Sequence, residues 1–347
     1  MNPFNLLGIK PCTLACGFDT TLTPGIIVFE LVIAIATMLV LWLGYKKYPD
    51  ILKRYGLIAT GIFLFEFFTH PMWNNAHLGK YAYVYRDVSW VLTMGWTTMV
   101  TGVLLLVDTY LPKWKVLPKF FVTIVSLMAM VLVAETVVVN LGIRTYGPEV
   151  LDLIGNSWIP GLNGVPWQIF YYVPVFMALV VSFYRYWEIF LDNAPVVPQK
   201  RQPWLQTLLV TFIGVFFFEL MVEPMVVNAN LPQWSYVYRD VSIIMSGAWI
   251  LIIWLATLAV KRFFIHFNVR SAFISIVTTA SMLAIPLEWW LINHGYRVYG
   301  PSATANFSGY LTPILGIPIE ITFAIPFYLA LMIAFARYWE IVIDNKR

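Results

Sequence analysis

The sequence predicts an all-α fold, a polytopic bundle of transmembrane helices, and three of its features support this prediction. Hydrophobic residues make up 60% of the 347 residues and charged residues only 12%, about half the charged share of an ordinary soluble domain. The apolar runs are too long for barrel strands and do not alternate strictly, and within lipid only helices and closed barrels satisfy the backbone. A seven-residue sequence that occurs twice adds an internal repeat.

Nine apolar stretches are each long enough to cross a bilayer, which takes about 20 helical residues. They cover residues 24–45, 56–76, 88–109, 119–141, 166–188, 205–228, 241–261, 270–292 and 316–339. The segment Met1–Gly17 holds two Pro and two Cys and lacks the apolar core of a cleavable signal peptide. Its Cys12 and Cys16 lie on the side where a disulfide is permitted, if this segment is outside the cell.

Lys and Arg concentrate in every second connection between these stretches. The other connections, together with the amino-terminal segment, hold only Lys10, Lys80, Arg86, Arg144, Arg239 and Arg297. Because basic residues favour the cytoplasmic side, we expect the amino terminus outside and the carboxyl terminus in the cytoplasm. The motifs Arg185-Tyr186-Trp187-Glu188 and Arg337-Tyr338-Trp339-Glu340 have the composition of anchors at the membrane interface.

The sequence Tyr-Val-Tyr-Arg-Asp-Val-Ser occupies residues 83–89 and again residues 236–242, an offset of 153 residues. The same offset aligns further polar residues, namely Glu66 with Glu219, Asn75 with Asn228, Glu135 with Glu288, Asn140 with Asn293, Arg144 with Arg297 and Tyr146 with Tyr299. We therefore expect an outside segment and first span in 1–50, a four-span repeat in 51–193, a Pro-rich cytoplasmic linker in 194–204 and a second four-span repeat in 205–347. Repeats with an even number of spans run parallel, about an axis along the membrane normal.

Four glutamates lie within apolar stretches, toward the outer side: Glu66, Glu135, Glu219 and Glu288. A carboxylate inside the membrane costs about 2.5–3.5 kcal/mol and normally faces the interior of a bundle. The matched positions therefore predict a shared polar cavity open to the outer half. The Arg-Asp pairs at 86–87 and 239–240 have a structural alternative, because they stand where spans begin, and there an Asp or Ser can cap a helix.

Positions where the two repeats differ are candidates for an asymmetric site. At matched positions His70 gives way to Glu223, Gln168 to Glu320, and Leu141 to His294. Glu219 and Glu223 are four residues apart, hence on one helical face. Two close acids in a poorly solvated site do not both ionise easily, so one of them is suited to act as a general acid. Alternatively, a protonated Glu there would only form a hydrogen bond between helices.

The segment from Glu288 to Glu320 resembles a known family. It contains Glu288, then Gly295-Tyr296-Arg297-Val298-Tyr299, and then Gly316-Ile317-Pro318-Ile319-Glu320 at the start of the last span. This pattern resembles the small integral-membrane lycopene cyclases of the heterodimeric bacterial and fungal type, and it is similar to membrane carotenoid hydratases. The resemblance implies that a carboxylic acid protonates an isoprenoid double bond, and that the carbocation is then closed or hydrated. Only Glu288, Tyr299 and Glu320 match position by position, and Ile321 replaces a second Glu of the family pattern.

The resemblance thus implies an intramembrane isoprenoid cyclase or hydratase, and the candidate acids are Glu320, Glu223, Glu219 and Glu288. Further candidates for binding the substrate are Tyr299, His294, Asn228, Asn293, Arg239, Asp240, Glu66, Glu135, Arg86 and Asp87. The expected ligands are an apolar isoprenoid-like molecule and membrane lipid, with no nucleic acid.

Neither a cofactor nor a metal is expected, because the chain has four His and no multi-His motif. A carboxylate-rich di-metal site made of Glu66, His70, Glu219 and Glu223 stays open. The alternative function is non-catalytic: a transporter, or a subunit that binds pigment or lipid. A transporter would need the symmetric Glu and Arg residues to line a path that reaches both sides of the membrane.

Overall fold

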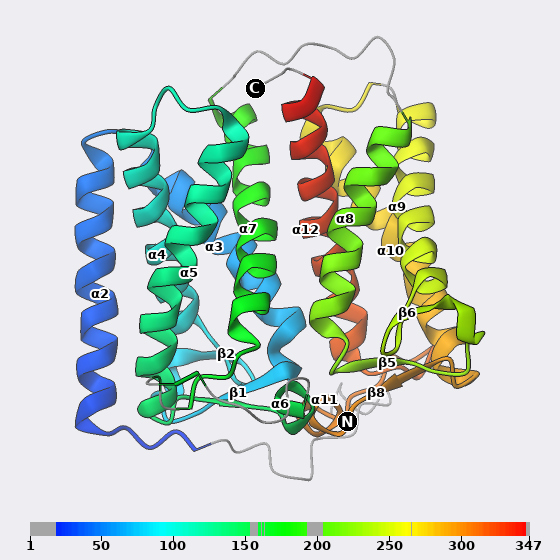
Figure 1. Cartoon of the computed structure of the whole chain (residues 1–347), viewed down its shortest axis with the longest axis horizontal. Coiled ribbons are helices and arrows are strands. Elements are labelled where there is room, and N and C mark those ends of the chain that lie inside the picture. The colour runs from blue at the N-terminus through cyan, green and yellow to red at the C-terminus, as the bar shows by residue number, and fades with distance from the viewer. Residues whose placement is uncertain are drawn as a thin grey trace, which may run out of the picture.

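The computed structural model describes residues 19–152, 159–160, 162, 164–192, 204–264 and 266–344. Cys12, Cys16 and all of the expected linker except Trp204 lie outside these ranges. The described chain is mostly helical, with short paired strands at one end of the bundle (Figure 1). This confirms the predicted helical class.

Within the described ranges, nine long helices form the bundle. They are α2 (Pro24–Tyr45), α3 (Ile51–Thr69), α4 (Trp90–Tyr110), α5 (Val116–Asn140), α7 (Ile169–Leu191), α8 (Trp204–Val222), α9 (Ile243–Phe263), α10 (Val269–Asn293) and α12 (Ile319–Asp344). Among the described residues, eight helices, all of these except α3, are long and apolar enough to cross a membrane. The protein is therefore a multi-pass membrane protein.

The second expected span, 56–76, differs from the prediction. Its helix, α3, carries Lys53, Arg54 and Glu66 and ends at Thr69. A 3₁₀ turn, η1 (His70–Met72), follows with a proline in its first turn, and the chain then becomes strand. Proline has no backbone N–H to donate and clashes with the preceding turn, so it does not continue a regular helix. The helix thus ends seven residues before the predicted end of this span.

In the described chain, short strands form four two-stranded antiparallel sheets. All of them lie at the end of the bundle opposite to the carboxyl-terminal end of α12 (Figure 1). The pairs are β1 (Trp73–Asn75) with β4 (Arg144–Tyr146), β2 (Tyr83–Tyr85) with β3 (Val88–Ser89), β5 (Val226–Asn228) with β8 (Arg297–Tyr299), and β6 (Tyr236–Tyr238) with β7 (Val241–Ser242). Asn75 faces Arg144 in one sheet, and Asn228 faces Arg297 in the matched sheet. The same register therefore occurs in both halves of the chain.

The duplicated heptapeptide forms a β-hairpin and a helix cap. Its Arg-Asp pair is the turn of the hairpin, where Arg86 and Arg239 have positive φ angles of 51° and 47°. Its serines cap the helices that follow: the Ser89 hydroxyl accepts hydrogen bonds from two backbone N–H groups of α4, and Ser242 accepts one from α9. The helix cap expected at these positions is thus formed by the serine, whereas the aspartate accepts a hydrogen bond from an asparagine.

Helices α7 and α12 meet in the middle of the bundle and bring the two halves together (Figure 1). Met177 of α7 and Leu329 of α12 are fully buried there. Helix α2 lies at one edge, against α3 and α4, and exposes most of its apolar side chains. The remaining short helices, α6 (Pro148–Asp152), α11 (Pro301–Asn306), η2 (Lys80–Ala82) and η3 (Gln233–Ser235), lie in the connections near the strands.

Candidate functional site

A cavity of about 720 Å³ lies in the second half of the chain, and three of the four predicted acids line it. We refer to it as the C-terminal cavity. Its polar lining residues are Glu219 of α8, Glu288 of α10, Arg297 and Tyr299 of β8, Glu320 of α12 and His70 of η1. The rest of the lining is apolar and largely aromatic, including Phe67, Phe68, Phe218, Trp249, Phe307 and Tyr328.

Glu320 lies in the first turn of α12 and is buried. Its Oε1 accepts hydrogen bonds from the Tyr85 hydroxyl at 2.8 Å and from the Ser308 backbone N–H at 2.5 Å. Its Oε2 is buried and has no hydrogen-bond partner among the described residues. Tyr85 belongs to the first-half hairpin, so the acid of the second half is held by a residue of the first.

Glu288 has a different environment, because a cation lies beside it. The Tyr299 hydroxyl donates to its Oε1 at 2.6 Å, and Arg297 Nε lies 3.3 Å from the same oxygen. Arg297 Nη1 also donates to Asn228 Oδ1 at 2.7 Å, which joins β8 to β5. The Oε1 oxygen of Glu288 thus faces Tyr299 and the guanidinium of Arg297, so the geometry places Glu288 as the partner of that cation.

Glu219 is the second acid in the cavity without a cation at hydrogen-bond distance. The Ser246 hydroxyl of α9 donates to its Oε2 at 2.5 Å, while its Oε1 is buried without a partner among the described residues. A buried polar atom that lacks a hydrogen bond costs about 1–3 kcal/mol. Glu219 Oε1 and Glu320 Oε2 are therefore the two carboxyl oxygens of this cavity that a proton or a ligand would satisfy, and His70 Nε2, Arg297 Nε and Tyr328 Oη also lack a hydrogen-bond partner among the described residues.

His70 is a cavity residue that the sequence analysis did not assign to the catalytic set. Its Nδ1 lies 2.8 Å from the Phe67 carbonyl oxygen. A carbonyl oxygen only accepts, so Nδ1 carries the hydrogen, and in neutral His70 the lone pair is on Nε2. Nε2 is buried without a partner in the described part of the chain. The mismatch between His70 and Glu223 was the available signal, but the position of the ring depends on the end of α3.

Glu223 does not line the C-terminal cavity. Its Oε1 pairs with Arg239 Nε at 2.9 Å, and it is hydrogen-bonded to Asp240. Asp240 also accepts from the Asn228 backbone N–H at 2.8 Å, and burial raises the pKa of Asp240 above its usual value. Although Glu219 and Glu223 are one turn apart, they face different surroundings, and the geometry does not bring them together as an acid pair.

Asp87 repeats the role of Asp240 in the first half. It accepts from the Asn75 backbone N–H at 3.0 Å, and its own carbonyl accepts from Asn75 Nδ2 at 3.2 Å. Asn228 Nδ2 donates to the Asp240 carbonyl at 3.0 Å in the same way. Burial raises the pKa of Asp87 as well. These aspartates tie each hairpin to the neighbouring strand, outside the C-terminal cavity.

Two other predicted binding residues, Asn293 and His294, are exposed at the end of α10. Asn293 Nδ2 donates to the Trp289 carbonyl at 2.9 Å, and the His294 ring stacks on Trp290 with its Nδ1 2.8 Å from the Trp290 carbonyl. Neither residue lines the cavity, because both bond back to their own helix.

The first half has a matched but smaller cavity of about 410 Å³, the N-terminal cavity. Its polar lining consists of Glu66, Glu135, Arg144, Tyr146 and Tyr172. Tyr146 donates to Glu135, whose other oxygen lies 3.5 Å from Arg144 Nη1, and Thr93 donates to Glu66. Gln168, the counterpart of Glu320, is not in the lining. Its amide nitrogen donates to the Val150 carbonyl at 2.8 Å.

The geometry also bears on the di-metal alternative. Glu66 lines the N-terminal cavity and Glu223 is paired with Arg239, so neither joins His70 and Glu219. Within the described ranges, no group of three or more His, Cys, Asp or Glu is placed to hold a metal ion.

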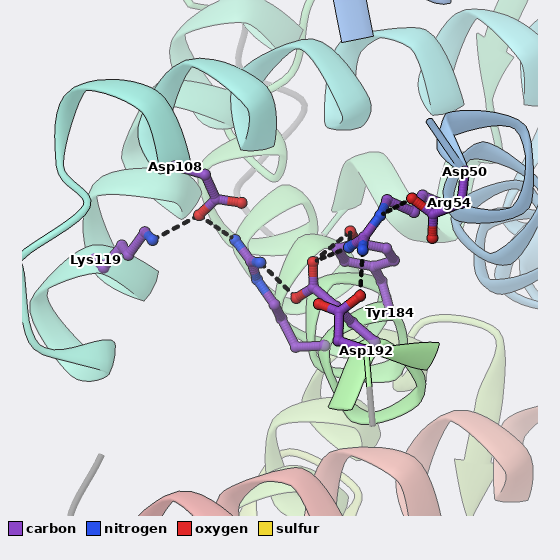
Figure 2. Close-up of polar contacts among 8 residues, drawn as sticks. Asp50, Arg54, Asp108, Lys119, Tyr184 and Asp192 are labelled. Carbon is purple, nitrogen blue, oxygen red and sulfur yellow. Dashed lines mark hydrogen bonds and ion pairs between the residues drawn. The ribbon is translucent and has the colours of Figure 1, made fainter. Parts of the chain in front are cut away.

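A network of charged residues lies at the opposite end of the first half (Figure 2). Arg54 pairs with Asp50, Glu188 and Asp192, and the Tyr184 hydroxyl donates to Glu188 at 2.6 Å. Arg185 bridges Glu188 at 2.6 Å and Asp108 at 2.8 Å, and Lys119 pairs with Asp108 at 2.6 Å. Arg185 and Glu188 are therefore mostly enclosed by protein, rather than free interfacial anchors.

Comparison of the chain with models of protein families, with curated proteins and with solved structures finds no match. The class of protein is therefore defined by the structure alone. It is a multi-pass membrane helix bundle that has an aromatic cavity lined by carboxyl groups.

Proposed function

We propose that this protein is an intramembrane enzyme that protonates a double bond of an isoprenoid, of the size class of carotenoids, in the C-terminal cavity. One observation carries the proposal. Two buried carboxyl groups, Glu219 and Glu320, each have an oxygen without a hydrogen-bond partner in the described part of the chain, and both line a single cavity whose other walls are mainly apolar, with several aromatic side chains. An apolar ligand fits such walls, and an acid that meets it there needs no cofactor to start a carbocation reaction.

In this proposal Glu320 is the general acid. Its Oε1 is held by Tyr85 and by the Ser308 N–H, so a proton on Oε2 is aimed away from these donors. Transfer of that proton to one carbon of the double bond leaves a carbocation on the other carbon and a carboxylate on Glu320. Aromatic faces such as Trp249 and Tyr328 stabilise a cation near their ring centres, and Glu219 supplies a second carboxyl group nearby.

His70 is the proposed base that completes the reaction. For a cyclisation, a second double bond of the same isoprenoid attacks the carbocation, which moves the positive charge to the other carbon of that double bond. Nε2 then removes a proton from a carbon next to the new cation. For a hydration, Nε2 takes a proton from the attacking water. In either case the proton on His70 returns to Glu320, so the catalyst is regenerated. Positioned general acids and bases contribute about 10²–10⁴-fold each.

We also propose the duplicated architecture and the orientation as part of this function. Equal registers of the β1–β4 and β5–β8 sheets, and equal Asn-to-Asp hydrogen bonds, support two parallel four-span repeats after α2. The distribution of Lys and Arg supports an external amino terminus and a cytoplasmic carboxyl terminus. The cavity would then open toward the outer leaflet.

A non-catalytic transporter is the second candidate, and the network of Figure 2 is the observation that favours it. Charged groups lie at both ends of the first half, the Glu135–Arg144 pair at one end and the Arg54 cluster at the other. Each of these charges already has a partner of opposite sign, which favours a structural role over a conducting one.

The test is to express the protein in cells that accumulate a linear carotenoid and to analyse extracted pigments by chromatography and mass spectrometry. We expect the wild type to form a cyclised or hydrated product, and Glu320→Gln to lower its amount by about 100-fold or more. Glu66→Gln, which changes a buried acid of the N-terminal cavity held by the Thr93 hydroxyl, is the control and should leave the product unchanged if the protein is folded. The absence of a new product in the wild type, or full activity of Glu320→Gln, would reject the proposal.

A further inference from the structure

A third hollow, distinct from both cavities, is lined by residues of α5, α7, α8 and α12. Of these helices, α7 and α12 lie side by side where the two halves meet (Figure 1). We name this hollow the lateral groove. The space between its walls, including the part open to the outside, is about 1270 Å³; its lining is almost entirely apolar, and it shares no residue with the C-terminal cavity. Its floor is buried, with Leu179 only 2% exposed, and its rim is open, with Phe121 59% exposed. The groove therefore faces the hydrocarbon of the membrane and is open along its side.

A polar pocket adjoins the lateral groove at the end where α5 begins. Phe120 lines both hollows, and its ring packs edge-on against Trp339 at 4.8 Å. The polar pocket, of about 620 Å³, is lined by Lys119, Thr123, Arg185, Glu188 and Tyr338 besides apolar residues. We name it the basic pocket, because two cations and one carboxylate line it.

The cations of the basic pocket are held in place by carboxylates behind them. Lys119 and Arg185 both bind Asp108, and Arg185 also binds Glu188 (Figure 2). A lysine ammonium has three N–H donors, and within the described chain Lys119 has one carboxylate partner. Donors of Lys119 thus remain for a ligand, and the fixed position of the ammonium group lowers the entropy cost of binding one.

From this arrangement we infer that the lateral groove and the basic pocket together bind one anionic glycerophospholipid. Its phosphate lies against Lys119 and Arg185, and an acyl chain lies in the groove. The two hollows have the order of polarity of such a lipid, and basic pockets between transmembrane helices bind phosphate head groups. Since the groove opens sideways, a lipid of the surrounding bilayer enters it without passing through the bundle. The inference does not depend on the proposed enzymatic activity.

The experiment uses the full-length protein, purified in mild detergent and examined by native mass spectrometry. Phosphatidylglycerol and phosphatidylcholine with identical acyl chains are added in turn. We expect one phosphatidylglycerol to bind in preference to phosphatidylcholine, and Lys119→Gln to weaken its binding about five-fold, the effect of one interfacial cation. Lys113→Gln removes an exposed lysine that does not line the pocket, and it should bind like the wild type.

A second variant tests the groove rather than the charge. Ala178→Phe places a ring among the groove residues of α7 and should weaken binding of both lipids, whereas Lys119→Arg should restore the preference for phosphatidylglycerol. Thermal unfolding of each variant shows whether it is folded. If Lys119→Gln does not fold, the lipid preference of the wild type and the result for Ala178→Phe decide the question.

Three results would overturn the inference. The first is equal binding of the two lipids by the wild type, and the second is unchanged binding by folded Ala178→Phe. The third is binding of farnesyl phosphate without binding of phosphatidylglycerol, which would assign the phosphate site to an isoprenyl phosphate instead.

Discussion

The N-terminal and C-terminal cavities share a frame of four polar residues at matched positions, two Glu, one Arg and one Tyr, yet the empty space at the first is about 410 Å³ and at the second about 720 Å³. In each, a tyrosine and an arginine of one strand hold a glutamate of the helix before it. A second glutamate receives a hydroxyl hydrogen bond, from Thr93 in the first half and from Ser246 in the second. The polar frame is therefore the same in both, and the difference lies in what surrounds it.

Side-chain size accounts for the difference in volume. Trp73 and Tyr172 line the N-terminal cavity, and the residues at the matched positions of the C-terminal cavity are Val226 and Ala324. At a third matched position the first half has Gln168, bonded to a backbone carbonyl outside its cavity, while the second half has Glu320 inside its own. This comparison teaches that the frame alone does not make a site. The C-terminal cavity lacks two of the rings that fill the N-terminal cavity and contains one more acid.

The largest expected effect tests whether the frame is shared. Replacing Arg144 or Arg297 by Met leaves a buried carboxylate, Glu135 or Glu288, without its cation, and breaking a buried pair costs about 3–5 kcal/mol. We expect both variants to lose stability to the same extent, measured by denaturant unfolding of the purified protein. If one variant is unaffected while the other unfolds, the polar frames of the two cavities are not equivalent.

The next effect separates the two cavities by function. Glu219→Gln should lower product formation by about 100-fold, because it removes a carboxyl group from the proposed reaction site. The matched variant Glu66→Gln changes a buried acid in the same frame and should keep full activity. Both are measured by pigment analysis at equal amounts of folded protein. Equal losses in the two variants would indicate a structural role for both glutamates.

A smaller effect tests the explanation by side-chain size. Ala324→Tyr introduces into the C-terminal cavity the ring that Tyr172 provides in the first half. We expect it to reduce activity about ten-fold by excluding substrate, while overpacking costs about 1–3 kcal/mol of stability. Ala324→Ser is the matched control, since it adds one atom and should be nearly as active as the wild type. If the tyrosine variant is fully active, the reaction does not take place in this cavity.

Part of this comparison was predictable from the sequence. Acids inside apolar stretches are rare, so Glu66, Glu135, Glu219 and Glu288 were recognisable, and the offset of 153 residues paired them. The asymmetry at position 320 was also visible. The hairpins were not, because Tyr-Val-Tyr-Arg-Asp-Val-Ser directly precedes an apolar run and resembles the start of a helix.

Contacts between the two halves of the chain could not be predicted from local sequence patterns. Tyr85 and Glu320 are 235 residues apart, and no spacing rule joins them. His70 reaches the second cavity only because α3 ends at Thr69 and the chain turns through Pro71. Helical spacing predicted that Glu223 lies beside Glu219 as an acid pair. Helix α8 ends one residue earlier, at Val222, and the carboxylate of Glu223 instead pairs with Arg239 of the hairpin.

The smallest expected effect compares the two hairpin aspartates through pH. Burial raises the pKa of both Asp87 and Asp240 above 3.8, so the folded state binds their protons more tightly than the unfolded chain. Their contribution to stability is therefore fully present below pH 3.8 and is lost as the pH rises through the raised pKa of each.

Asn at either position keeps an oxygen acceptor for the Asn75 or Asn228 N–H but does not titrate. We expect Asp87→Asn and Asp240→Asn each to flatten the rise in the midpoint of thermal unfolding as the pH is lowered from 7 toward 4, compared with the wild type. Since Asp240 shares a hydrogen bond with Glu223 whereas Asp87 has His70 nearby, a flattening confined to Asp240→Asn would place the acidic pair, rather than the shared frame, at the origin of the pH dependence.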